Sequence, residues 1–221
     1  MRPSGFSKLL FLLFTSAWLG AQEAAPKKHT VLFMTFDRFE FHTEVKLSYI
    51  NKVNSLEGDQ YYELLSRAFI DAFVLGDFPN VEYREMSSED CHRILPLLSF
   101  KVYHGMGHYA ANLDDLHQNM LQKLLSDYDC QYLMIVDWYR IFESLESTKS
   151  KNVKQFNTYA EHMMDFDLFN SEKKRTDYGA DLRFGVKPTP DNLKYSGLRI
   201  SDLRLEFHKL AVEISRGLKF E

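Results

Sequence analysis

The chain has few cysteines and no excess of basic residues, and each shortage excludes a class of protein. Its 221 residues include only Cys91 and Cys130, so the fold is not a disulfide scaffold. An oxidising compartment would allow a bridge between them, and two free buried thiols agree with the sequence equally well. The 27 lysines and arginines are outnumbered by 31 acidic residues, which gives a net charge of −4. This balance argues against binding to nucleic acid and to anionic membranes, because both attract basic surfaces.

Recognisable catalytic motifs are also missing. The sequence has no Gly-x-Ser-x-Gly elbow to present a nucleophilic serine, and neither cysteine stands in an active-site context. Catalytic triads assemble in space rather than in sequence, so this absence does not exclude an enzyme. It makes catalysis the less favoured interpretation, and nothing in the sequence indicates a cofactor.

Residues 1–22 have the pattern of a secretory signal peptide. Arg2 and Lys8 introduce an apolar run from Leu9 to Gly20, and small residues surround its end. The run is shorter than the roughly 20 apolar residues that span a bilayer, and an uncleaved membrane anchor is the alternative. No cysteine near the expected cleavage region could accept a lipid. We therefore expect a periplasmic or secreted protein whose mature chain is not stably inserted in a membrane.

Residues 23–221 are long enough for one domain, and they alternate between strand and helix patterns. β-branched and aromatic runs predict strands, whereas apolar residues at three- and four-residue spacing predict helices. We expect strands over 30–39, 80–86, 131–144, 155–170 and 177–186, and helices over 59–75, 87–94, 112–128 and 201–218. Residues 42–58 are expected to form an irregular connection, and 97–111 show no clear pattern. The order β-α-β-α-α-β-β-β-α predicts a single mixed α/β (α+β) domain with helices packed on a mixed sheet.

The segment His104-Gly-Met-Gly-His108 is the most distinctive local motif. Two histidines four residues apart on a helix can bind a transition metal, and His92 and His117 lie near them in sequence. The two glycines disfavour a helix, however, and the acid that zinc proteases carry between their histidines is absent. The motif is therefore either the centre of a metal-dependent hydrolase that uses His104 and His108, or a glycine-rich loop with surface histidines.

Aspartates recur in the expected late strands. Asp165 and Asp167 alternate along one strand, so both side chains would point to one face. Such a pair suits a cation site or acid–base chemistry. We favour the solvated face of a hairpin, with Phe166 and Leu168 turned inward. Asp137 follows the apolar run of the central strand, and acids at strand ends are catalytic in some α/β proteins.

Aromatic residues of the late strands are the remaining candidates. Trp138, Tyr139, Phe142 and Tyr159 could present a partner-binding surface, since exposed aromatics are common at interfaces. The alternative is that they pack beneath the helices. An aromatic pocket that carries a small ligand is a third functional hypothesis.

Several segments resemble those of known proteins in their order and in their pattern of apolar and polar residues. They are the expected first strand, Tyr61–Leu75, Leu113–Tyr128, the hydrophobic strand Asp129–Val136, the hairpin Phe166–Lys174 and the closing helix Ser201–Leu218. This pattern, over residues 30–218, resembles a group of bacterial envelope proteins: the curli-secretion-channel family, the lipoprotein activators of penicillin-binding proteins and the auxiliary components of ABC-type transport. Unlike that group, the chain has no lipidated cysteine and no long inserted amphipathic segment. The resemblance implies an accessory protein that binds an envelope protein partner, with no catalytic residues to carry over.

Overall fold

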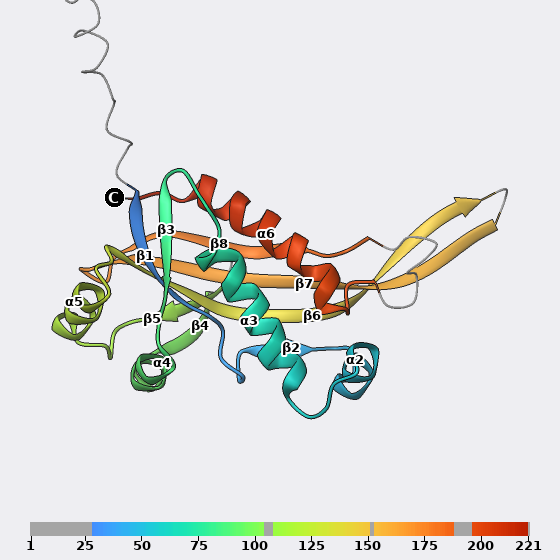
Figure 1. Ribbon diagram of the computed structural model, residues 1–221, viewed down its shortest axis with the longest axis horizontal. Coiled ribbons are helices and arrows are strands. Elements are labelled where there is room, and N and C mark those ends of the chain that lie inside the picture. The colour runs from blue at the N-terminus through green and yellow to red at the C-terminus, as the bar shows by residue number, and fades with distance from the viewer. Residues whose placement is uncertain (1–27, 104–107, 151–152, 188–195, 221) are drawn as a thin grey trace, which may run out of the picture.

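The computed structural model describes residues 28–103, 108–150, 153–187 and 196–220 (Figure 1). Its helices are α2 (Leu47–Asn54), α3 (Gln60–Val74), α4 (Ser88–Ile94), the short 3-10 helix η1 (Leu95–Leu97), α5 (Gln118–Asp127) and α6 (Ile200–Gly217). Its strands are β1 (His29–Met34), β2 (Phe41–Thr43), β3 (Val81–Glu85), β4 (Ser99–Tyr103), β5 (His108–Asn112), β6 (Tyr132–Ser150), β7 (Val153–Asn170) and β8 (Arg175–Phe184). No helix among these residues is both long enough and apolar enough to cross a membrane.

The main sheet is mixed, which confirms the expected α/β class. Its strands lie in the order β3-β1-β6-β7-β8, and the short β2 pairs with β6 off that path. β1 runs parallel to β3 and β6, and β2 also runs parallel to β6. β6, β7 and β8 are antiparallel neighbours. The connections explain this division, because hairpin turns join antiparallel strands whereas parallel strands need a longer crossover.

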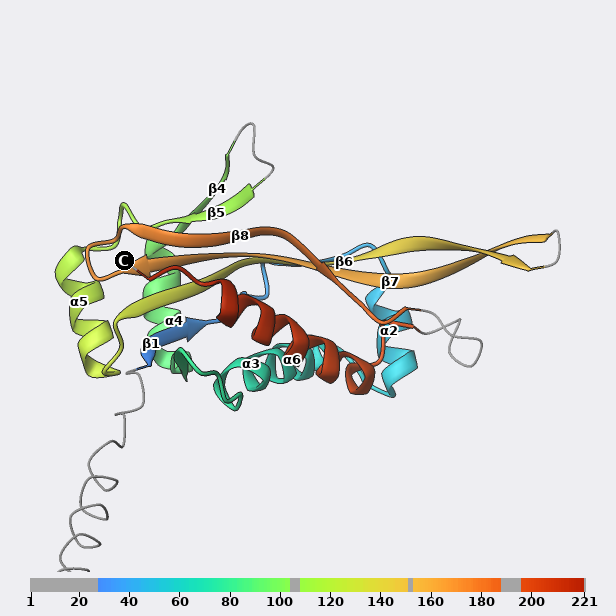
Figure 2. The ribbon, with the colours of Figure 1, turned by 90° about the horizontal axis from the view of Figure 1, so that it is seen from above.

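Helices cover both faces of the sheet (Figures 1 and 2). Along β1, Val31 and Phe33 point into the core formed with α3 and α6, and Leu32 and Met34 point into the core formed with α4 and α5. The first core is highly aromatic. For example, the rings of Phe69 on α3 and Phe207 on α6 meet edge to face with centroids 5.3 Å apart. Burying each large apolar side chain contributes roughly 1.5–3 kcal/mol, so these layers supply most of the driving force for folding.

Two of the expected helix starts have different outcomes. Ser87 caps α4 as expected, since its Oγ accepts a hydrogen bond from the backbone N–H of Asp90 at 3.1 Å. The helix predicted from Asn112 was placed too early, because α5 begins only at Gln118. The Asn112 side chain accepts from the backbone N–H of Asp114 at 2.8 Å, so it closes a local turn rather than a helix.

Residues 42–58, which were expected to be irregular, contain the helix α2, and α2 stabilises the start of α6. The side chain of Asn54, the last residue of α2, forms hydrogen bonds at the start of α6. The Asn54 side chain accepts from the Ile200 N–H at 3.1 Å and donates to the Leu198 carbonyl at 2.9 Å. The expected cap, Ser201, lies inside α6. A residue from a distant helix therefore satisfies the free amide at the α6 terminus.

Residues 97–111, which lacked a clear pattern, contain a second, two-stranded sheet. β4 and β5 pair antiparallel, from Ser99 opposite Asn112 to Tyr103 opposite His108. This β4–β5 hairpin lies on the α4 and α5 side of the main sheet (Figure 2). It covers the part of β7 that carries the alternating aspartates.

The two longest strands continue beyond the helices as a projecting ribbon (Figures 1 and 2). β2 pairs with β6 only as far as Ile141, and β8 pairs with β7 only as far as His162. Beyond those points the two strands pair with each other, from Glu143 opposite Ala160 to Ser150 opposite Val153. At about 3.4 Å per residue the ribbon is roughly 25 Å long. We call residues 143–150 and 153–160 the arm.

Candidate functional site

The aromatic candidates on β6 do not share one environment. Tyr139 points into the α3 and α6 core and is fully buried, which agrees with the alternative interpretation that it packs beneath the helices. Trp138, Phe142 and Tyr159 are half-buried. Strand alternation separates them from Tyr139, because neighbouring residues on a strand point to opposite faces.

Tyr139 instead belongs to a buried hydrogen-bond chain at the root of the arm. The His162 imidazole lies 2.8 Å from the Tyr139 hydroxyl through Nδ1 and 2.7 Å from the Gly197 carbonyl through Nε2. Burial lowers the pKa of His162 to about 4, so the ring is neutral at pH 7. Since a carbonyl only accepts, Nε2–H donates to Gly197, and Nδ1 therefore accepts from the Tyr139 hydroxyl. This chain ties β6, β7 and the segment before α6 together where the arm leaves the core.

Gly197 is required at this junction. Its φ of +79° lies in the left-handed region, and a Cβ there would stand 2.2 Å from the carbonyl oxygen of Ala160. The Ala160 N–H in turn donates to the Ser196 carbonyl at 3.0 Å. The last residue of the arm on β7 is thus clamped by backbone contacts that only glycine permits.

Arginines and aromatic rings alternate on the opposite face of β6. The Arg140 guanidinium lies 5.8 Å from the ring centroids of both Trp138 and Phe142, and Arg183 of β8 lies 5.3 Å from that of Phe142. Arg140 is also ion-paired with Glu44. Cation–π contacts of this kind contribute about 0.5–1 kcal/mol each at exposed sites, so they order this face without burying it.

The alternating aspartates are buried, so their expected position on a solvated hairpin face is wrong. Asp137, Asp165 and Asp167 are all 0% exposed, beneath the β4–β5 hairpin. Phe166 and Leu168 do point into the opposite core, as expected. The strand alternation was therefore predicted correctly, and the error came from the hairpin, whose position could not be inferred from residues 97–111.

Asp137 has an unusual electrostatic environment within this acidic group. It occupies the irregularity in β6 where the pairing with β7 shifts between Val136 and Trp138. No hydrogen-bond donor among the described residues reaches either of its carboxyl oxygens. Burial raises its pKa well above the usual range. The negative charge of Asp167, a hydrogen bond that Asp137 can donate to Asp167 only when it is protonated, and the charge of Asp165 raise the pKa further. Asp137 is consequently a carboxyl that favours its protonated form.

The two cysteines are free thiols, and both are half-buried. Cys91 lies 3.9 Å from the Met86 carbonyl and Cys130 lies 3.5 Å from the Tyr128 carbonyl, each measured from Sγ. Burial raises the pKa of each thiol to about 11. The thiolate is the nucleophilic form, so neither residue is activated for catalysis at neutral pH.

The proposed metal ligands are only partly covered by the structure. His104 lies outside the described residues, and only the backbone position of His108, at the start of β5, is described. Across the described ranges, no group of three or more histidine, cysteine or acidic side chains could hold a metal ion. The metal hypothesis stays a prediction for these two histidines.

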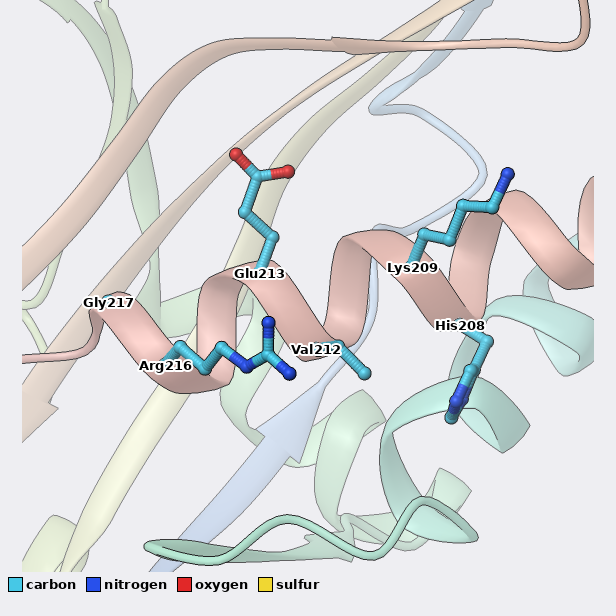
Figure 3. Close-up of a pocket in the computed structure, with 6 residues that line it drawn as sticks. All are labelled: His208, Lys209, Val212, Glu213, Arg216 and Gly217. Carbon is cyan, nitrogen blue, oxygen red and sulfur yellow. The ribbon is translucent and has the colours of Figure 1, made fainter.

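A surface hollow on α6 offers no convergent chemistry. Figure 3 shows that its lining comes from this one helix, with Lys209 and Glu213 on one side and His208 on the other. The lining residues are His208, Lys209, Val212, Glu213, Arg216 and Gly217. Side chains that diverge around a helix do not enclose a ligand, so the arm and its root are the better candidate for a functional region.

Comparisons with known proteins identify no family. Neither a protein-family model nor a curated protein sequence matches the chain. Among solved structures, the fold is similar to a neuraminyllactose-binding hemagglutinin homolog from Helicobacter pylori, with 9% identity, a TM-score of 0.41 and coverage of 90% of each chain. It is also similar to the hypothetical protein CT253 from Chlamydia trachomatis, with 7% identity, a TM-score of 0.40 and coverage of 86% of this chain and 96% of that one. At these values neither similarity bears on the function of this chain.

Proposed function

We propose that this chain is a secreted or periplasmic accessory protein that acts by binding another protein of the cell envelope through its arm. The observation that supports this proposal is the projection of β6 and β7 beyond the helices as a two-stranded ribbon. The sequence adds the signal-peptide pattern of residues 1–22 and the resemblance to envelope accessory proteins.

The arm has the physical properties of a binding element. An isolated two-stranded ribbon is marginally stable in water, and its outer edges carry unpaired N–H and C=O groups. β2 pairs with β6 only as far as Ile141. Beyond that residue, β7 is the only strand that pairs with β6 in the described part of the chain. A strand of another protein that pairs with this edge would satisfy these groups and order the ribbon. Leu145, 68% exposed on the same strand, would add apolar contact.

Hydrogen bonds hold the root of the arm in place, so the conformational freedom lost on binding is confined to the ribbon beyond the root. The Tyr139–His162–Gly197 chain and the Ala160–Ser196 hydrogen bond hold the ribbon at its origin. A preorganised element loses less entropy when it binds than a disordered one. The half-buried Trp138 and Phe142 extend the candidate surface from the arm onto the sheet.

Site-specific photo-crosslinking tests this proposal in the native envelope. A photoreactive residue replaces Leu145 on the arm, and a matched variant replaces Leu205 on α6, which is also an exposed leucine at 60%. We expect one envelope protein to be crosslinked at position 145 and not at 205. Identical products at both positions, or none at 145, would contradict an arm-mediated role.

Shortening the arm provides an independent test. Residues 146–157 are replaced by Asn-Gly, a dipeptide that closes hairpins and keeps Leu145 opposite Thr158. Because the described core residues of β6 and β7 that lie nearest the arm tip are Ile141 and Ala160, the unfolding temperature should stay the same while the crosslinked partner is lost. Retention of the partner by the shortened protein would refute the proposal.

A further inference from the structure

The β4–β5 hairpin is joined to the main sheet by side chains rather than by a backbone ladder. The Tyr109 N–H donates to Asp165 Oδ2 at 3.1 Å, and the Ala111 N–H donates to Asp167 Oδ2 at 2.8 Å. Arg175 Nη2 donates to the Ala111 carbonyl at 3.4 Å. Two carboxylates and one guanidinium thus satisfy the edge of β5 that faces the sheet.

The same side chains are linked to the rest of the sheet. Arg175 Nε lies 3.0 Å from Asp167 Oδ1, and the Asp181 N–H of β8 donates to Asp165 Oδ1 at 2.7 Å. Each aspartate therefore has one oxygen on the hairpin and the other on the β8 side. A disturbance of either carboxylate is transmitted directly to the attachment of β5.

Asp137 introduces a third carboxyl group into this enclosed space. It is fully buried, no donor among the described residues reaches it, and after burial the negative charge of Asp167 has the largest effect on its pKa. The positive charge that faces it is Arg175. From β5, Tyr109 also faces it, and the Tyr109 hydroxyl is held 3.3 Å from Glu40. If all three aspartates were ionised, three negative charges would lie close together in a fully buried site.

We propose that Asp137 holds a proton as part of the folded structure, and that release of this proton loosens the β4–β5 hairpin from the sheet. The protonated carboxyl donates to Asp167, so the two groups share one hydrogen. Its loss leaves two acceptors in contact with no hydrogen between them, which is unfavourable in a buried site. Separation of the hairpin admits water and relieves the repulsion, because it frees Asp165 and Asp167 from the β5 amides. The hairpin is therefore a pH-sensitive flap.

The direction of the pH effect follows from the state that binds more protons. Between the ordinary aspartate pKa of about 3.9 and the raised value in the folded chain, the docked hairpin holds a proton that the loosened one releases. The contribution of Asp137 to docking is therefore fully present below about pH 3.9 and weakens as the pH rises towards its pKa in the folded chain. This is the opposite of the usual behaviour of a carboxylate that is paired with a cation.

Amide hydrogen exchange measured by NMR on the full chain tests the flap. The wild-type protein is compared with Asp137→Asn, which keeps the shape and removes the titration. We expect the protection of the Tyr109 and Ala111 amides to fall by up to about tenfold per pH unit above pH 5 in the wild type, after correction for intrinsic exchange. The variant should show constant protection of both amides, and the amides of β1 should behave alike in both proteins.

Parallel pH profiles for the two β5 amides in the wild type and the variant would overturn the proposal. Equal loss of protection in β5 and β1 would also overturn it, since that would indicate global unfolding. Asp137→Ser, neutral and smaller, replaces the asparagine variant if that protein does not fold. Its amides should show the same constant protection.

Discussion

Replacing Tyr139 with phenylalanine should destabilise the protein, whereas the same change at Tyr61 should not. Both tyrosines are fully buried in the same core. The Tyr139 hydroxyl donates to His162 Nδ1 at 2.8 Å, but the Tyr61 hydroxyl has no hydrogen-bond partner among the described residues. The two substitutions remove the same oxygen atom from similar surroundings and differ in whether a hydrogen bond is lost.

The magnitudes follow from what each change leaves behind. Tyr139→Phe leaves His162 Nδ1 buried without a donor, which costs about 1–3 kcal/mol. For a chain of this size, each kcal/mol corresponds to about 2–4 °C in the unfolding temperature, so a decrease of roughly 2–12 °C is expected. Tyr61→Phe removes a hydroxyl that is desolvated without compensation. Its effect should lie between zero and a gain of about 1 kcal/mol.

Thermal and urea unfolding at pH 7, followed by circular dichroism, measure both changes. The wild-type protein and the double variant complete the comparison and show whether the two sites act independently. If Tyr139→Phe and Tyr61→Phe change the free energy of unfolding by the same amount, the assignment of the buried hydrogen-bond chain is wrong.

Two further predictions concern the same region. Because the pKa of His162 is lowered to about 4 from 6.5, the neutral ring stabilises the fold above pH 6.5, and this stabilisation is lost as the pH falls towards 4. His162→Gln should remove that part of the acid sensitivity, up to about 1.4 kcal/mol per pH unit, in urea unfolding at pH 4–7; identical pH profiles would contradict it. Gly197→Ala should destabilise by more than about 2 kcal/mol, since it adds a clash with Ala160 to the left-handed strain, whereas Gly58→Ala, at φ +54° with open space around it, should cost only about 1–2 kcal/mol. Equal unfolding temperatures for the two glycine variants would show that the contact at Ala160 is not tight.

The elements with a strong local signal were predictable from the sequence. Apolar residues at three- and four-residue spacing from Tyr61 to Phe73 predict α3, and Ser87 as an N-cap residue predicts the start of α4. The long late strands were also anticipated, since aromatic and β-branched runs specify strands wherever a core can cover them. The prediction of a mixed sheet followed from the order of these elements.

The candidate site could not be predicted, because it depends on contacts between distant segments. Asp165 and Asp167 alternate as a solvated strand does, and only the covering hairpin shows that they are buried. Nothing local marks residue 54 as the cap of α6, which begins at Ile200. Tyr139 was grouped with the other aromatic residues of the late strands by residue type, and strand alternation, which separates it from Trp138 and Phe142, cannot by itself say which face the helices cover. Local patterns identify faces, and tertiary contacts decide which face meets water.

The position of the arm strands within the sheet has a mechanical consequence. β6 lies between β1 and β7, and β7 lies between β6 and β8, so the ribbon is a direct continuation of two central strands. A force applied along the arm would load the hydrogen bonds to β1 and β8 together and in shear, instead of breaking them one after another as peeling does. The tension would reach the middle of the sheet, between its two layers of helices. A partner that pulls on this arm would therefore pull on two strands that are each hydrogen-bonded to neighbours on both sides within the sheet.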